Sequence, residues 1–199
     1  ASDVYKRQIL FAVIGSFTSE AEVASHGFRL FPESLTLDTY KYVFLTQGKK
    51  LVNAYKISII NTIAGTAISL FVTITYAYVI SVRDFKMGNK FAFFAYFTML
   101  FNGGMLAWYL ICTQYLGLKD NMWAMILPYC MNVFNMYLMR NFFKGLPYEL
   151  VESAKIDGAG HFRILLQVIL PLSKAGVVTI ALFYALQYWN DFYLSLIHI

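Results

Sequence analysis

The chain has 199 residues, of which 59% are hydrophobic and 14% are charged, and its mean hydropathy is +0.56. Soluble domains carry about 25% charged residues, so this composition excludes an ordinary soluble enzyme. The formal net charge of +5 comes from short basic patches beside apolar runs, which is typical of membrane-flanking loops and not of nucleic-acid binding. The sequence therefore predicts an all-α, multi-pass protein whose partner is the lipid bilayer and not a nucleic acid.

The two ends of the chain carry related peptides. Residues 3–8 can be encoded by GATGTGTATAAGAGACAG, and the reverse complement of that string encodes residues 194–199. The string resembles the transposase end that is used to fragment DNA for sequencing. We therefore expect residues 1–8 and 194–199 to be foreign to the native protein, which leaves 9–193 as a piece truncated at both ends.

Ahead of the main apolar region, the chain has one short apolar run and one polar stretch. Residues 9–17 are apolar but fall short of the ~20 residues needed to cross a bilayer, so we expect the remnant of a first span. Residues 18–52 are expected to form an extracytoplasmic loop, in which 34–44 forms a short amphipathic helix. The transmembrane core is then expected over 53–193.

A long uncharged run over 57–82 predicts the first complete span. Asn61, Gly65 and Ser69 recur at every fourth position, so small and polar groups follow one stripe that suits close helix packing. The run ends in the short basic loop 83–90, which the positive-inside rule places in the cytoplasm.

Two further spans are expected over 91–115 and 122–139. The first is interrupted at 102–104 by Asn-Gly-Gly, where the missing side chains favour a kink. The second contains Pro128, which leaves backbone acceptors to be satisfied by neighbouring helices or water. A last apolar run begins at Ala175.

The connector over 141–171 is expected in the cytoplasm, because two spans separate it from the 83–90 loop. In it we expect a short exposed helix of about ten residues, in which Pro147 occupies the first turn, Glu149 complements the positive end and Gly158 supplies a stop. A second amphipathic run follows the glycine.

The side chains of this expected helix suggest both an internal pair and a docking face. Glu152 and Lys155 are spaced as i, i+3 partners. Leu150, Val151 and Ala154 form a small apolar face that suits docking into a groove.

The connector also carries a spaced motif. Glu152-Ser153-Ala154 is followed by Gly158 and then by Val168-Ile169-Leu170-Pro171. This pattern resembles the EAA loop of binding-protein-dependent ABC importer permeases, E-A-A-x3-G-x9-I-x-L-P. Ser153 replaces the middle alanine and Val168 the isoleucine, and the spacing matches throughout.

The resemblance extends over 9–193. Residues 157–159 (Asp-Gly-Ala) and 189–192 (Trp-Asn-Asp-Phe) resemble the carbohydrate branch, with its maltose and oligosaccharide permeases. The resemblance implies a polytopic transmembrane helical bundle of the MetI-like type in the cytoplasmic (inner) membrane of a bacterium.

The implied function is that of a permease subunit of an ATP-driven importer for a sugar or oligosaccharide. Two alternatives are a permease for another solute and a non-ABC polytopic membrane protein. The sequence has no Gly-rich phosphate loop of the G-x4-G-K-[ST] kind, so we expect no cofactor on this chain and place ATP and Mg²⁺ on a partner ATPase. The other implied partners are a second permease subunit and an extracytoplasmic sugar-binding protein.

For coupling to the ATPase, the resemblance points to connector residues. Glu152 is expected to make a charged contact, Gly158 to form the turn, and Leu150 and Ala154 to pack in a groove. The full set is Leu150, Glu152, Ser153, Ala154, Asp157, Gly158, Ala159 and Pro171.

Polar side chains at membrane depth are candidates for a substrate path, because amides can donate to and accept from sugar hydroxyls. These candidates are Asn102, Asn132, Asn135, Gln187 and Asn190, and the aromatic residues that can stack on sugar faces are Trp108, Tyr109, Tyr188 and Trp189. The alternative is that the amides bond neighbouring helices and the aromatic rings lie at the membrane interface. No metal site is expected, since no histidine has other ligands at a suitable spacing.

Overall fold

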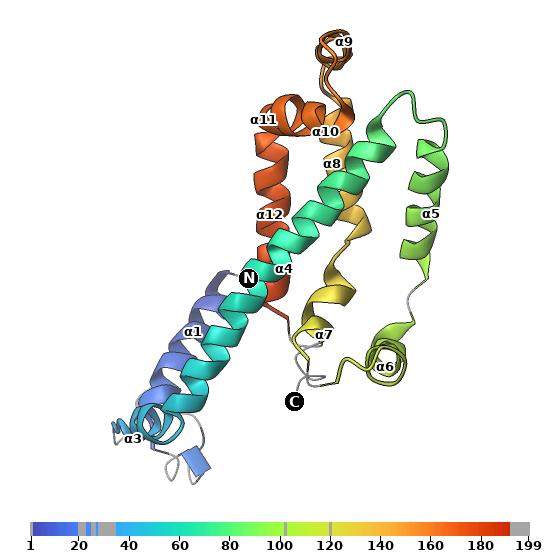
Figure 1. Ribbon diagram of the computed structural model, residues 1–199. Helices are drawn as coiled ribbons and strands as arrows, with labels where there is room; N and C mark the ends of the chain where they lie inside the picture. The colour runs from blue at the N-terminus through green and yellow to red at the C-terminus, as the bar shows by residue number, and fades with distance from the viewer. Residues whose placement is uncertain are drawn as a thin grey trace. The chain divides into compact units, whose positions relative to one another are not determined.

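The computed structural model describes residues 2–19, 23–24, 27, 35–101, 103–119 and 121–191, and these are almost wholly helical. The chain divides into two compact units, residues 1–57 and 58–199. Figure 1 shows the helices in chain order, coloured from blue to red. The expected foreign peptide at 194–199 lies outside the described residues.

The first unit contains α1 (Ser2–Phe17), α3 (Asp38–Lys41) and the π-helical turn η1 (Tyr42–Thr46). The apolar run 9–17 is the second half of α1. The hydroxyls of Ser16 and Tyr40 are 2.8 Å apart, and the Tyr40 ring packs 5.3 Å from that of Phe17. The short helix expected within 34–44 is present as α3 and η1, but it begins at Asp38 and ends at Thr46.

The longest helix is α4 (Gly48–Ser81), which has 34 residues. It begins at Gly48, so residues 48–52 are helical and not part of a loop as expected. By length and composition, α4 is the one helix among the described residues that can cross a membrane by itself. A second crossing would come from the segments 161–172 and 174–189 if they were one span, although they meet at 87°.

The span expected over 91–115 is broken in two, which is a larger interruption than the expected kink. It comprises α5 (Gly88–Leu100), α6 (Gly104–Leu110) and the π-helical turn η2 (Ile111–Tyr115). Phe101 is extended, and Gly104 has a φ of +76°. This left-handed conformation is accessible to glycine at little cost, so the helix ends where the sequence supplies glycines.

The span expected over 122–139 is not one continuous helix. The structure has α7 (Trp123–Ile126), a 3₁₀ turn η3 (Leu127–Tyr129) that holds Pro128, and then α8 (Val133–Lys144). Asn132 starts α8 by accepting hydrogen bonds from the backbone N–H groups of Phe134 and Asn135, at 2.9 and 3.3 Å. An asparagine at this position favours a new helix start over continuation.

After α8 the chain forms the short helix α9 (Tyr148–Ile156) and a second helical segment made of α10 (His161–Ile164), η4 (Leu165–Ile169) and α11 (Leu170–Leu172). The final described helix is α12 (Lys174–Trp189). The connector thus contains the two helical segments that the sequence predicts.

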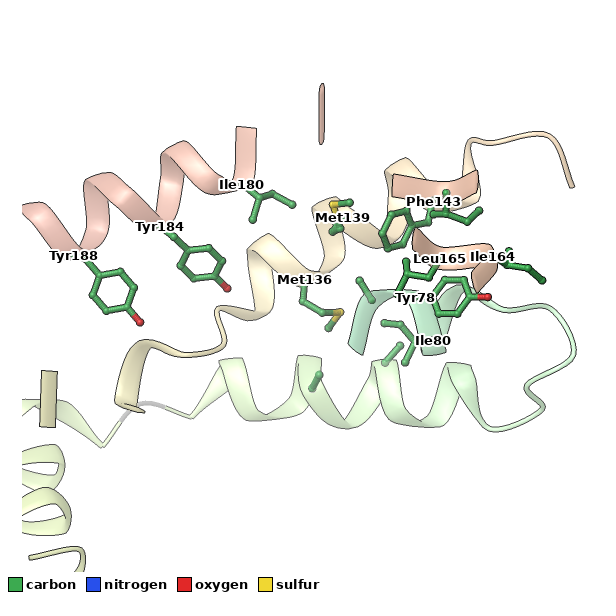
Figure 2. Packing of buried hydrophobic residues seen from close by; sticks show 14 residues of the cluster. Tyr78, Ile80, Met136, Met139, Phe143, Ile164, Leu165, Ile180, Tyr184 and Tyr188 are labelled. Carbon is green, nitrogen blue, oxygen red and sulfur yellow. The ribbon is translucent and has the colours of Figure 1, made fainter. Parts of the chain in front are cut away.

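The core of the second unit forms where α4, α8 and α12 pack together (Figure 2). The predicted stripe on α4 is confirmed, since Asn61, Gly65 and Ser69 are all buried, and it continues through Thr73 and Ala77. A Cβ atom on Gly65 would lie 2.7 Å from the ring of Tyr188, so only glycine allows this close approach.

Four buried hydroxyl groups tie α4 to α12, and we call Ser69, Thr73, Tyr184 and Tyr188 the hydroxyl cluster. The oxygens of Thr73 and Tyr184 are 2.6 Å apart, and those of Ser69 and Tyr188 are 2.8 Å apart. The cluster also reaches the broken segment, because the N–H of Asn132 donates to Tyr184 at 2.9 Å and Tyr188 donates to the carbonyl of Ile126 at 3.1 Å. The four hydroxyls of the cluster are therefore paired between α4, α12 and the segment from α7 to the start of α8.

Candidate functional site

The helix α9 has well-defined ends. Pro147 lies just before the first helical residue and not in the first turn as expected, and Glu149 lies in the first turn. At the other end, the N–H of Gly158 donates to the carbonyl of Lys155 at 3.0 Å and that of Ala159 to Ala154 at 2.9 Å. This pair of bonds is a Schellman motif.

Gly158 is required at this end by its backbone conformation. Its φ is +77°, and a Cβ atom built there would meet nothing within 4 Å. Any cost of a side chain is therefore backbone strain and not a clash. The prediction that Gly158 stops the helix is confirmed.

The two faces of α9 differ in burial, although the helix has no fully buried residue. Val151 and Ala154 are half-buried and pack against the core of the second unit. Leu150 is 42% exposed and Ile156 is 82% exposed. The exposed surface of α9 thus carries two large apolar side chains, of which the sequence pointed only to Leu150.

The other predicted coupling residues divide in the same way. Glu152, Ser153, Asp157 and Pro171 are exposed. Ala159, like Ala154, is half-buried and packs against the core, so both alanines face this chain. The predicted groove contact of Ala154 stays a prediction, and the structure adds an internal contact for this side chain.

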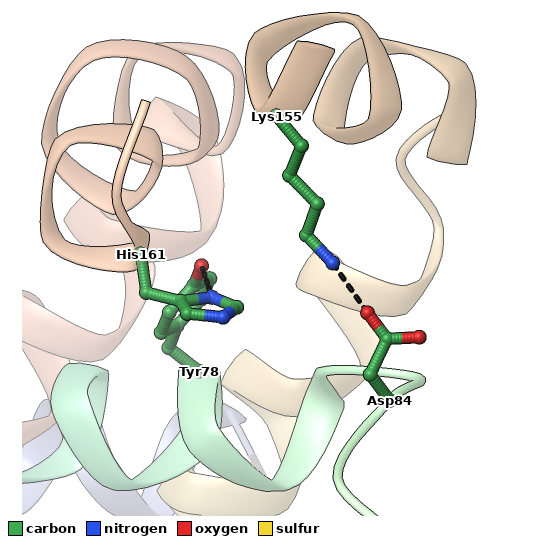
Figure 3. Close-up of polar contacts among 4 residues, drawn as sticks. All are labelled: Tyr78, Asp84, Lys155 and His161. Atoms are coloured by element: carbon green, nitrogen blue, oxygen red, sulfur yellow. Dashed lines mark hydrogen bonds and ion pairs between the residues drawn. The ribbon is translucent and has the colours of Figure 1, made fainter. Parts of the chain in front are cut away.

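Lys155 pairs with Asp84, and not with Glu152 as the i, i+3 spacing favoured (Figure 3). The hydrogen bond from Lys155 lowers the pKa of the Asp84 carboxyl. The same bond raises the pKa of the Lys155 ammonium group. Because the Asp84 side chain is 63% exposed, water screens this pair.

Two further contacts hold the connector to the end of α4. The hydroxyl of Tyr78 lies 3.2 Å from Nδ1 of His161 (Figure 3), and the guanidinium of Arg83 lies 4.3 Å from the ring centroid of Tyr148. Residues 78–84 therefore contact the start of α9, its last turn and the start of α10. We call these three contacts, Tyr78–His161, Arg83–Tyr148 and Asp84–Lys155, the α4 tethers.

The sequence did not reveal the α4 tethers. The paired residues are 71 positions apart for Asp84 and Lys155 and 83 for Tyr78 and His161. The charge of the 83–90 loop was the available signal, but it carries no information about which connector residue lies opposite.

The structure assigns internal contacts to some of the predicted substrate-path residues. Asn102 lies outside the described residues. Asn132 caps α8, Asn135 is buried, and Nδ2 of Asn190 donates to the carbonyl of Leu186 at 2.9 Å.

Gln187 is half-buried on α12. Tyr188 is 2% exposed and belongs to the hydroxyl cluster, so it cannot stack on a sugar in this conformation. Trp108, Tyr109 and Trp189 are exposed. The sequence analysis did not predict that Tyr184 and Tyr188 are buried and hydrogen-bonded in the core.

Comparison with known proteins gives a consistent result. Residues 90–197 match the family model described as "Binding-protein-dependent transport system inner membrane component". Protein LplC of Bacillus subtilis is 46% identical over 190 residues, covering 96% of this chain and 63% of LplC. The polygalacturonan/rhamnogalacturonan transport system permease protein YtcP of the same organism is 39% identical, covering 96% of this chain and 65% of YtcP.

A solved structure is also similar. The crystal structure of a bacterial ABC transporter involved in the import of the acidic polysaccharide alginate contains a chain with a TM-score of 0.78 and 30% identity, covering 95% of this chain and 68% of that one. The present chain spans less than two thirds of the length of LplC and YtcP.

Proposed function

Because this chain belongs to the family of binding-protein-dependent transport system inner membrane components, we propose that it acts as a permease subunit of an ATP-driven importer. Family membership sets aside the non-ABC alternative. The cargo we propose is an oligosaccharide, because relatives are named as permeases for polygalacturonan/rhamnogalacturonan and galactooligosaccharides. The partners we propose are ATPase subunits that bind ATP and Mg²⁺, a second permease subunit and an extracytoplasmic binding protein.

The observation that supports a coupling role is the exposure of α9. A short helix that exposes Leu150 and Ile156 offers apolar side chains to a groove, and Glu152, four positions before Ile156, adds a charge on the same side as Ile156. Its inner face is held by Val151 and by the α4 tethers. We place residues 141–171 on the cytoplasmic side, where an ATPase can reach this face.

In this proposal ATP acts through α9 by linkage. A nucleotide shifts the permease between two arrangements only if the docked helix makes different contacts in each. Displacement of α9 would reach α4 through the tethers, since these join the helix to residues 78–84. Gly158 supports the proposal by fixing where α9 ends.

The experiment is charge reversal on the outer face of α9 in the full-length permease with its partners. Glu152→Lys is expected to leave membrane insertion intact while abolishing co-purification of the ATPase and ATP-dependent uptake, and Gly158→Asp is expected to act alike. The control is Asp38→Lys, which reverses an exposed carboxylate in the first unit. Normal uptake by both α9 variants would refute the coupling proposal.

A further inference from the structure

A pocket of about 300 Å³ lies behind α9, between the end of α4, the end of α8 and the start of α10. Phe143 and Ile169 contribute apolar walls. Its polar wall is basic, with side chains from the turn after α4 (Arg83), from α8 (Lys144), from α9 (Lys155) and from α10 (His161). Among the described residues, the pocket wall contains no aspartate or glutamate.

The positive charge of this wall is only partly compensated. Lys155 pairs with Asp84, which lies beside the pocket. Arg83 offers the face of its guanidinium to Tyr148, so the N–H groups around the edge stay available as donors. Lys144 has no ion pair or hydrogen bond within the part of the chain that the structure describes.

His161 adds a further donor or acceptor at the pocket. Its Nδ1 is 3.2 Å from the hydroxyl of Tyr78, which leaves Nε2 without a contact of its own in the described structure. Burial, and to a smaller extent the charge of Arg140, lowers the pKa of Lys144. The acids of α9, Glu149 and Glu152, do not line the pocket and so do not neutralise it.

We propose that this pocket binds a phosphate group, with Arg83, Lys144 and His161 as its donors. Two cations and a histidine from separate parts of the fold suit a multiply charged oxyanion, and arginine is well shaped for phosphate oxygens. The phosphate can belong to an anionic lipid headgroup or be free in solution, because basic pockets at the cytoplasmic side of helical membrane proteins suit either source. Bound phosphate would join α4, α8 and α10 behind α9.

Inorganic phosphate, titrated into the full-length chain in detergent, tests the site directly. Lys144→Gln is the first variant, because Lys144 has no described partner whose loss would disturb the fold. It is expected to weaken phosphate binding about tenfold, as loss of one charge-assisted hydrogen bond implies. Lys90→Gln removes an equal charge from an exposed residue outside the pocket and is expected to change affinity less than twofold.

A second measurement identifies the source of the phosphate. The chain is placed in nanodiscs of phosphatidylcholine, with and without phosphatidylglycerol, and phosphate is titrated again. If phosphate binds in phosphatidylcholine nanodiscs but not when phosphatidylglycerol is present, the site is assigned to a lipid headgroup. If phosphate binds equally in both kinds of nanodisc, the site is assigned to a free anion. Absence of binding in detergent and in both nanodiscs, or equal binding by wild type and Lys144→Gln, would overturn the proposal.

Discussion

The middle and the end of α4 make contacts of opposite character. In the middle, Ser69 and Thr73 are fully buried and bond to Tyr188 and Tyr184 at 2.8 and 2.6 Å. At the end, the α4 tethers use exposed side chains such as Arg83 and Asp84. Buried hydrogen bonds are costly to break, whereas exposed ion pairs contribute little and exchange readily with water.

This difference separates a fixed part of the molecule from one that can rearrange. The hydroxyl cluster holds α4 and α12 together. Any movement of Tyr184 or Tyr188 away from α4 would break a buried hydrogen bond. The tethers hold α9 in place, and water can replace the contacts of the exposed Arg83 and Asp84 more readily than that of the buried Tyr78. The following substitutions test the contrast.

The largest effect is expected from Tyr188→Ala. It removes a large buried ring that packs over Gly65 and breaks the bond to Ser69, so we expect a loss of about 3–5 kcal/mol in the free energy of unfolding. Chemical denaturation in detergent measures it. Tyr115→Ala, at a position that is 82% exposed, serves as the control, and an equal loss there would contradict the assignment of Tyr188 to the fixed part.

A smaller effect is expected from Gly158→Ala. The left-handed backbone at +77° penalises a side chain, and no atom lies within 4 Å to add a clash, so the cost should be about 1–2 kcal/mol of local stability at the end of α9. Hydrogen exchange of the amides in 148–159 reads it out. Gly160→Ala is the matched control, because Gly160 has a φ of −72° and equally open surroundings. Equal exchange in both variants would refute the strain argument.

The smallest effect is expected from Asp84→Asn, which removes one exposed tether and should speed exchange in α9 slightly. The wild-type contribution should depend on pH at both extremes. Since the pKa of Asp84 is lowered, its stabilisation is present above the ordinary carboxyl pKa and is lost as pH falls through the folded value. Since the pKa of Lys155 is raised, its stabilisation is lost as pH rises through its folded value.

The same pH series on Asp84→Asn gives the check. The substitution should remove the acidic limb of the α9 exchange profile, while Asp38→Asn should leave it in place. An acidic limb that persists in Asp84→Asn would show that another group causes it.

Local patterns predicted the parts of this fold that depend on local physics. The four-residue spacing of Asn61, Gly65 and Ser69 fixed one face of α4, and the glycine at 158 fixed the end of α9. The break before α8 was missed, because the capping ability of Asn132 outweighs the apolar character of the segment around it.

The sequence also could not predict which residues far apart along the chain contact one another. Lys155 had Glu152 three positions away, yet it bonds Asp84, since folding brings the end of α4 closer to that side of α9. The inward-facing position of Ala154 has the same origin, because the sequence identifies an apolar face but not which neighbour covers it. The candidate coupling residues therefore stay a predicted set, which the structure divides into exposed and half-buried members.

The length of α4 has a consequence for how the protein meets the bilayer. At 1.5 Å per residue its 34 residues extend about 51 Å, against a hydrocarbon thickness of about 30 Å. Absorbing that mismatch by tilt alone would require about 54°, beyond the 0–40° found for spanning helices. The portion from Ile57 to Ser81, about 38 Å long, fits with a tilt of about 37°. We therefore expect the bilayer boundary near Lys56, with the turn that carries Lys49 and Lys50 about 8–10 Å beyond it, at the outer edge of the headgroup layer, where lysine ammonium groups stay hydrated.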